Sequence, residues 1–470
     1  MLSVAMGVFL STIDGSIVNV ALPTLEDELN TGFATVQWVV ISYLLVISSM
    51  MLGVARLADM TGKKRIYMSG MALFTVASVL CGLAPSVGFL IAFRVLQGLG
   101  AVAMQALGVA IITETFPREE RGRALGISGT VVSLGIITGP TLGGLLIGTV
   151  GWRAIFLVNL PVGLIGLLLV RRHVPDWRPP GGQRFDRAGA VIMLLTLVAF
   201  ALGRTFGPET GWNQPAIIAL LVGAAVGLVV FLAVERRLSQ PMIDLSLFRD
   251  SLFSVSLLTA LLVFIMVGGG LLIIPFYLEL VQGFETQQVG LLMSVFPIAM
   301  GITAPIAGSL SDRWGSRGIS LLGLVVVSLA CAGVATLTED TTVPGYILRM
   351  VPFGVGVGLF QSPNNSAIMG AAPRERLGVA SGLLALSRTL GQVTGIPLIG
   401  AIFASRVIAY GSLDSDIDVT DAPIDAMVAG VQTVYTVAAI LIAVAAGLAL
   451  WAFVIQQRRG QVAARAGSTG

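Results

Sequence analysis

Apolar residues dominate long stretches of this chain, and polar residues gather in the short segments that separate them. The stretches lack strand-like alternation, and most reach the roughly 20 residues that a helix needs to cross a bilayer. The pattern predicts fourteen membrane-spanning helices. Their expected ranges are 5–25, 36–55, 67–84, 87–113, 122–147, 153–171, 188–206, 214–234, 252–276, 286–308, 319–338, 346–370, 378–404 and 428–456.

Charged residues between the spans indicate the orientation. If the N-terminus lies inside, most of the 28 lysines and arginines fall in inner loops, whereas Glu26, Asp27 and Glu28 fall outside. An excess of Lys and Arg marks the cytoplasmic side of membrane proteins. We therefore expect both termini in the cytoplasm and the protein in the plasma (inner) membrane.

Groups of residues recur in the same order at a separation of about 250 residues. Ala55–Asp59 and Gly62 match Gly308–Asp312 and Gly315, and Pro117–Glu119 matches Pro373–Glu375. Gly135, Gly139 and Gly144 match Gly391, Gly395 and Gly400. Leu22–Pro23 and Asp27 match Ile274–Pro275 and Glu279, and Arg94 and Gly100 loosely match Arg349 and Gly354. A duplication is the simplest explanation. It predicts a six-helix bundle at 1–171, a linker with two extra spans at 172–251, a second six-helix bundle at 252–457 and a cytoplasmic tail at 458–470. Two such halves around a midplane cavity are typical of transporters.

Composition narrows the class further. Hydrophobic residues make up 55% of the 470 and charged residues 11%, against about a quarter charged in soluble domains. This excludes a soluble enzyme, and a net charge of +3 argues against nucleic acid as a partner. Two isolated cysteines, Cys81 and Cys331, and one histidine, His173, predict no metal site. The chain also has no ATP-binding signature, so we expect a secondary transporter without a bound cofactor.

Two charged residues stand deep inside predicted spans: Asp14 in the first and Arg94 in the fourth. A charge at the bilayer centre costs at least about 2.5–3.5 kcal/mol, so each must be paired, hydrated or neutralised. Their similar depths predict that they line one cavity, which Gln97, one turn along, also faces. A carboxylate whose charge balance changes with conformation can carry a coupling proton. Alternatively, Asp14 anchors helix packing and Arg94 braces the first span.

Further polar residues of the apolar spans are candidates for the same cavity. They are Asn19, Glu279, Arg349, Gln361, Asn364, Asn365, Arg388 and Gln392. For the amides, the alternative is hydrogen bonding between helices. For Glu279, the alternative is an ordinary charge of an outer loop.

Asp59 and Asp312 begin inner loops and are candidates for a conformational latch. Each is expected to cap the N-terminus of a helix in the other half, where the helix dipole favours an anion. Alternatively, each forms a local turn beside Gly62 or Gly315. Glu114 is expected to pair with Arg121, Lys63 or another neighbour, and Lys63 belongs to the predicted latch.

A run of small residues in the fifth span contains Gly135, Gly139, Pro140, Gly143 and Gly144. Small residues allow two helices to approach closely, and proline removes a backbone donor and can kink a helix. We expect a pliable, gating contact between the halves. The alternative is plain close packing.

Several motifs together resemble those of the major facilitator superfamily. The segment Ala55–Lys64 is similar to its loop 2–3 signature, Arg94–Gly100 to its fourth-span arginine signature and Gly135–Gly144 to its antiporter signature. Asp14–Pro23 and Trp152–Pro161 look like the 14-helix drug:proton antiporter family. Ala55 and Met60 depart from the loop signature, which usually has Gly and often Arg there.

The resemblance implies an all-α integral membrane protein with the major facilitator fold, made of two six-helix bundles plus two extra helices. It also implies a monomer that exports hydrophobic or cationic, amphipathic drugs by alternating access, with the proton as coupling ion and membrane lipids around it. Two alternatives remain open. One is a lipid or glycolipid translocator on the same fold, and the other is a specific small-solute transporter.

Overall fold

The computed structural model describes residues 1–31, 33–177, 186–211, 213–238, 241, 243, 245–411 and 422–467. Every regular element in these ranges is a helix, and fourteen helical segments are long and apolar enough to cross a membrane. The protein is therefore an all-α integral membrane protein, as predicted.

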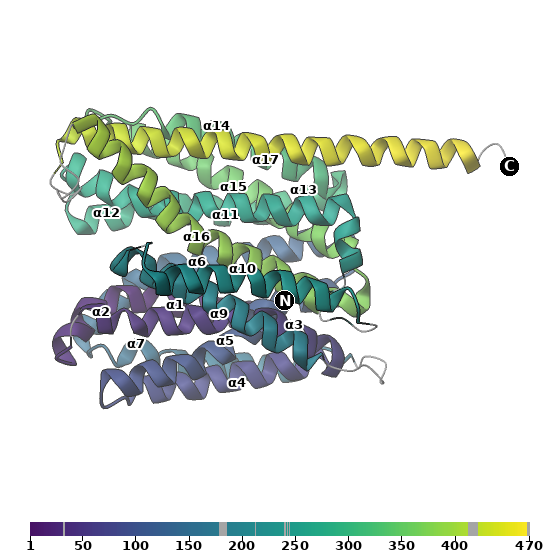
Figure 1. The fold of residues 1–470 in the computed structure, drawn as a ribbon, viewed down its shortest axis with the longest axis horizontal. Coiled ribbons are helices and arrows are strands. Elements are labelled where there is room, and N and C mark those ends of the chain that lie inside the picture. Colours follow the sequence, from purple (N-terminus) through teal and green to yellow (C-terminus); the bar gives the residue numbers. More distant parts are fainter. Residues whose placement is uncertain are drawn as a thin grey trace. The chain divides into compact units, whose positions relative to one another are not determined.

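The helices follow one another along the chain with short connections (Figure 1). The first eight are α1 (Leu2–Glu28), α2 (Phe33–Val36), α3 (Trp38–Thr61), α4 (Lys63–Gly82), α5 (Val87–Thr115), α6 (Arg121–Thr149), α7 (Ala154–Leu157) and α8 (Asn159–His173). The extra pair and the linker are α9 (Arg187–Thr210), α10 (Pro215–Glu235) and η1 (Leu245–Arg249). The remaining elements are α11 (Ser251–Phe276), η2 (Tyr277–Val281), α12 (Thr286–Met293), α13 (Val295–Trp314), α14 (Ser316–Val334), α15 (Val343–Ala371), η3 (Arg374–Arg376), α16 (Leu377–Gly411) and α17 (Ile424–Gly467).

The largest disagreement in boundaries concerns the last helix. The predicted span ends at 456, whereas α17 continues to Gly467. Hydropathy marks where a helix leaves the hydrocarbon layer. The helix itself continues because Gln, Arg and Ala are good helix formers.

The chain divides into two compact units that do not follow the sequence halves. Unit 1 comprises residues 1–115, 138–249 and 372–386, and unit 2 comprises residues 116–137, 250–371 and 387–470. The start of α6 thus belongs to unit 2 and the start of α16 to unit 1, because each contacts a helix from the opposite half of the sequence. The extra helices α9 and α10 group with unit 1. The predicted division of the chain into a bundle at 1–171, a linker at 172–251, a second bundle at 252–457 and a tail at 458–470 stays a prediction.

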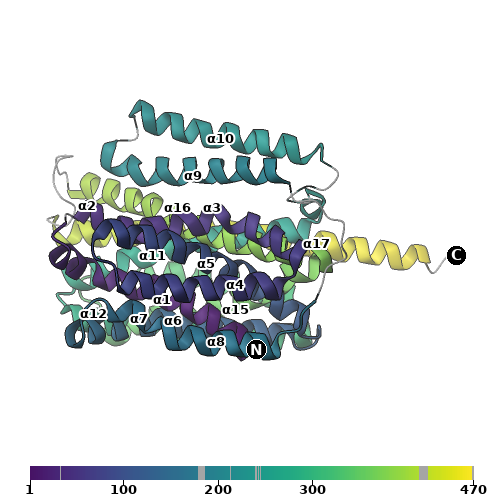
Figure 2. The same cartoon turned by 90° about the horizontal axis from the view of Figure 1, so that it is seen from below.

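In unit 1 the extra helices α9 and α10 lie side by side as an antiparallel pair (Figure 2). The Asp186 carboxylate caps α9 by accepting a hydrogen bond of 2.9 Å from the Gly189 amide. The pair contacts α3, where the Trp38 and Phe206 ring centroids are 5.4 Å apart. Exposed valines such as Val222, Val226 and Val229 on α10 suit a surface that faces lipid.

Two glycines separate consecutive helices without a loop. Gly62 ends α3 with φ +106°, and Gly315 ends α13 with φ +88°. Residues with a Cβ rarely adopt these angles, so glycine allows the abrupt change of direction. The two positions correspond in the duplication, and the structure preserves the same turn at both.

Candidate functional site

Unit 1 contains a buried polar network that we call the Asp14 cluster: Asp14, Tyr43, Ser78, Arg94, Gln97 and Asn159. Helix α1 supplies Asp14, and α5 supplies Arg94 and Gln97, one turn apart. Arg94 Nη1 donates to Asp14 Oδ2 over 2.6 Å, and Gln97 Nε2 donates to Asp14 Oδ1 over 2.8 Å. These three side chains are at most 1% exposed. The structure therefore pairs the two deep charges.

The other groups of the Asp14 cluster complete the hydrogen bonding. Asn159 Nδ2 donates to Asp14 Oδ1 over 3.3 Å and to Ser78 Oγ over 3.0 Å, and Ser78 Oγ donates to the Phe156 carbonyl over 2.9 Å. The Arg94 guanidinium carbon lies 4.0 Å from the centroid of the Tyr43 ring, a cation–π geometry. The carboxylate thus accepts from three donors, one of which is the Arg94 cation, so its charge is well compensated.

Three members of the Asp14 cluster were not among the predicted site residues. Asn159 carried a usable signal, because it stands in the Trp152–Pro161 motif. Tyr43 and Ser78 carried none, since a tyrosine or serine in an apolar span is ordinary. Their role depends on which neighbours α3 and α4 acquire on folding.

Unit 2 contains a second group, which we call the Arg388 cluster: Arg388, Asn365 and Phe264 are in contact, and Gln361 lies one helical turn before Asn365 on α15. Arg388 Nη2, on α16, donates to Asn365 Oδ1 on α15, and the guanidinium carbon lies 5.4 Å from the Phe264 ring centroid on α11. The Nε atom of Arg388 is buried and has no hydrogen-bond partner within the described ranges. No carboxylate of those ranges lies within 4.0 Å of this side chain's nitrogens.

The neighbouring amides of α15 divide into two kinds. Asn364 Nδ2 donates to the Ser256 carbonyl of α11 over 3.1 Å, which matches the alternative of a hydrogen bond between helices. Gln361 is 6% exposed, and its Oε1 atom has no partner in the described part of the chain. Gln361 therefore has a buried acceptor that is unpaired in the described part of the chain.

Four predicted cavity residues lie apart from both clusters. Asn19 is exposed and donates to the Gly15 carbonyl of its own helix over 3.1 Å. Glu279 and Gln392 have exposed side chains. Arg349 donates to Thr336 Oγ1 and to the Gly345 carbonyl, both over 2.9 Å, so it secures the start of α15. Its observed contacts differ from those of Arg94, despite the loose sequence match, and a role in the cavity stays a prediction.

Asp59 and Asp312 both cap helices from the opposite sequence half. Asp59 accepts from the amides of Gly378 (2.8 Å) and Val379 (2.9 Å) at the start of α16. Asp312 accepts from the amides of Gly122 (2.7 Å) and Arg123 (2.9 Å) at the start of α6. This is the arrangement predicted for a latch, whose role in gating stays a prediction.

The two caps differ in their surroundings. Lys63 Nζ lies 3.1 Å from Asp59 Oδ1 and 3.5 Å from Glu114 Oε1, which identifies Lys63 as a partner of Glu114. At the corresponding position after Asp312 the chain has Ser316. The Asp59 cap is therefore the more heavily charged of the two.

The predicted gating run packs against the first helix of its own sequence half. A Cβ atom on Gly139 would come within 1.9 Å of Ser16 Oγ, and one on Gly143 within 2.8 Å of Ile17. Gly144 faces open space, and Pro140 lies inside α6. The observed partner is thus α1 in unit 1, and a role in gating stays a prediction.

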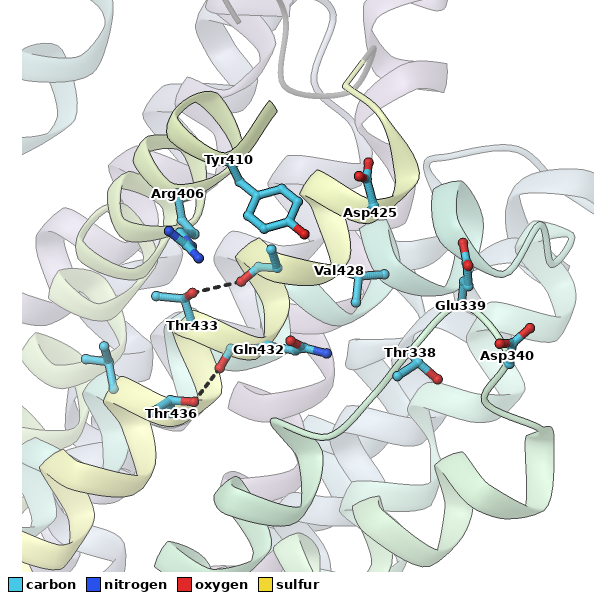
Figure 3. A pocket seen from close by; sticks show the side chains of 12 residues that line it. Thr338, Glu339, Asp340, Arg406, Tyr410, Asp425, Val428, Gln432, Thr433 and Thr436 are labelled. Atoms are coloured by element: carbon cyan, nitrogen blue, oxygen red, sulfur yellow. Dashed lines mark hydrogen bonds between the residues drawn. The ribbon is translucent and has the colours of Figure 1, made fainter. Parts of the chain in front are cut away.

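A pocket of about 600 Å³ opens at one end of unit 2 (Figure 3). Arg406 and Tyr410 of α16 and Asp425 of α17 contribute exposed side chains to it. Thr433 and Thr436, also in its wall, hydrogen-bond to carbonyls of their own helix. These polar groups are solvated or locally satisfied, unlike those of the Arg388 cluster.

Fourteen candidate spans in two helical units are typical of a membrane transporter. The model of the Major Facilitator Superfamily matches residues 4–396, and the chain belongs to this superfamily. The multidrug resistance protein Stp of Mycobacterium tuberculosis is 37% identical over 87% of this chain and 76% of its own length. The riboflavin transporter RibZ of Clostridioides difficile is 33% identical over 86% of this chain and 88% of its own. The crystal structure of the human organic anion transporter MFSD10 has the same fold, with a TM-score of 0.67, 14% identity and coverage of 95% and 98%.

Proposed function

We propose that the protein exports amphipathic small molecules across the plasma membrane in exchange for protons. Relatives named for multidrug resistance support the export of drug-like compounds. The bias of Lys and Arg toward one side supports cytoplasmic termini. The protein works as a monomer surrounded by membrane lipids.

The buried pair of Asp14 and Arg94 carries the proposal of proton coupling. A carboxylate inside a membrane protein is stable as an anion only while a cation and donors hold it, and otherwise it takes up a proton. Asp14 is held by Arg94, Gln97 and Asn159 in this state. A movement of α5 relative to α1 would break the pair and favour the protonated acid.

The transport cycle follows from that switch. Asp14 takes up a proton when its site is open to the outside and separated from Arg94. When the site opens inward, Arg94 returns to Asp14, the proton leaves and substrate binds. The caps at Asp59 and Asp312 form and break as the inner side closes and opens.

The predicted preference for cations has weak support in this state. Asp14 is the single carboxylate deep in the predicted spans, and Arg94 already neutralises it. A cationic substrate would have to displace Arg94. Polar groups other than Asp14 are therefore better candidates for recognising the charge of the substrate.

The experiment is proton flux in liposomes with an imposed pH gradient, on addition of amphipathic dyes. We expect substrate-dependent flux from the wild type and none from Asp14→Asn, which keeps the size of the side chain. Asp27→Asn, which changes an exposed carboxylate near the end of α1, is the matched control. Flux that survives in Asp14→Asn removes Asp14 from coupling. A folded wild type without flux for any dye contradicts drug antiport and favours the lipid translocator or the specific small-solute transporter.

A further inference from the structure

Arg388 occupies a depth at which a charge is costly. It lies eleven residues into α16. At 1.5 Å per residue this is roughly 16 Å from the start of the helix, about half of a 30 Å hydrocarbon layer. Its side chain is partly exposed, and its Nε atom is buried.

Among the residues that the structure describes, no carboxylate pairs with this cation. In the described part of the chain its guanidinium group donates one hydrogen bond, to the neutral amide of Asn365, and its Nε atom has no partner. Each ion pair found within those ranges joins other residues. Water can satisfy the free N–H, but it does not cancel the charge.

The surroundings of Arg388 suit an aromatic acid. The guanidinium group is planar and matches the two oxygens of a carboxylate. Phe264 offers an aromatic face beside it, 5.4 Å from the guanidinium carbon. Gln361, one helical turn from Asn365, presents an unpaired Oε1 that accepts from a hydroxyl or N–H group.

We propose that the Arg388 cluster binds the acidic group of an amphipathic aromatic substrate. A carboxylate or phenolate oxygen pairs with Arg388, a donor group of the same molecule bonds to Gln361 Oε1, and its ring system lies against Phe264. This inference rests on the proposed function and changes the expected substrate from a cation to an acid. Asn365 is a positioning residue, because it holds the guanidinium group through Oδ1.

Two dyes of similar shape and opposite charge test the proposal. Fluorescein is a xanthene dye with a free carboxylate, and rhodamine 123 is a cationic xanthene whose carboxyl group is esterified. Binding of each dye to the purified protein is measured by fluorescence polarisation, and uptake is measured in liposomes that contain the same protein.

The variants separate charge from folding. Arg388→Gln should weaken fluorescein binding at least about tenfold, because a bond to a charged group is lost. Arg388→Lys keeps the charge and should retain part of the affinity. Arg406→Gln changes an exposed arginine of the same helix and should leave fluorescein binding unchanged. Rhodamine 123 should bind the wild type and Arg388→Gln equally, or bind neither.

The outcomes distinguish this inference from the proposed function. Fluorescein binding that Arg388→Gln leaves unchanged, or a wild type that binds rhodamine 123 and not fluorescein, overturns the inference. A wild type that binds neither dye also overturns it. If fluorescein binds through Arg388 but moves no protons in liposomes, the inference stands and proton coupling fails.

Discussion

The Asp14 cluster and the Arg388 cluster differ in how they compensate a charge inside a membrane. In the Asp14 cluster, Arg94 forms an ion pair with the Asp14 carboxylate, and neighbouring donors complete the hydrogen bonding of that carboxylate. In the Arg388 cluster, a cation meets one amide and an aromatic ring. A closed network suits an internal switch, whereas an open one suits a ligand that brings the missing charge.

The duplication shows where this difference arose. At the separation that relates Leu22–Pro23 to Ile274–Pro275, Asp14 corresponds to Met266. Cys81 and Cys331 lie at nearly the same separation: Cys81 Sγ contacts Gln97 Oε1 at 3.5 Å, and Cys331 Sγ contacts Met266 Sδ at 3.8 Å. The two cysteines thus contact different helices of the repeat, and the position of the Asp14 carboxylate holds a thioether in the second half. Equivalent positions in the two halves therefore need not share a function.

The largest effect is expected from a variant that breaks the ion pair of the Asp14 cluster. Arg94→Ala leaves Asp14 buried without its cation, and we expect a loss of about 3–5 kcal/mol in unfolding free energy. Thermal unfolding in detergent measures it, with Arg349→Ala as the arginine control. Replacing both partners, as Arg94→Ala with Asp14→Asn, should recover much of the loss. A stable single variant would contradict the account of Asp14 as a compensated anion.

A smaller effect tests the helix contacts that position each cluster. A Cβ on Gly395 would come within 2.0 Å of the Ile265 backbone carbonyl, whereas on Gly139 the nearest atoms would be side-chain atoms, Ser16 Oγ at 1.9 Å and Ser16 Cβ at 2.7 Å. Gly395→Ala should therefore cost about 1–3 kcal/mol and Gly139→Ala less. Gly400→Ala and Gly144→Ala, which face open space, are the controls. Equal costs at Gly395 and Gly139 would contradict this reasoning.

The smallest effect on stability is expected from a variant of the Arg388 cluster, and it can be compared with that of Arg94→Ala. Arg388→Leu removes a cation that has no carboxylate partner, so no opposite charge is stranded. We expect thermal stability in detergent to stay unchanged or to rise by about 1 kcal/mol. Dye binding should fall in the same protein. A loss as large as that of Arg94→Ala would show that Arg388 has a structural partner.

The sequence predicts some contacts of the candidate site residues and not others. The depths of Asp14 and Arg94 predicted their pairing, because a lone charge inside a membrane needs a partner. The loose match of Arg349 to Arg94 predicted a second cavity residue, and the structure shows a helix-end contact there. A shared position in a repeat says nothing about which side chains surround it.

By itself the sequence determined the membrane class, the fourteen spans and the duplication, because these follow from hydropathy and from residue order along the chain. Tertiary structure alone decided that Tyr43, Ser78 and Asn159 complete one cluster and that Arg388 has no counter-ion among the described residues. It also decided which helix starts Asp59 and Asp312 cap. The physical reason is that compensation of a buried charge depends on distances of a few ångströms between helices, and those distances exist only in the folded protein.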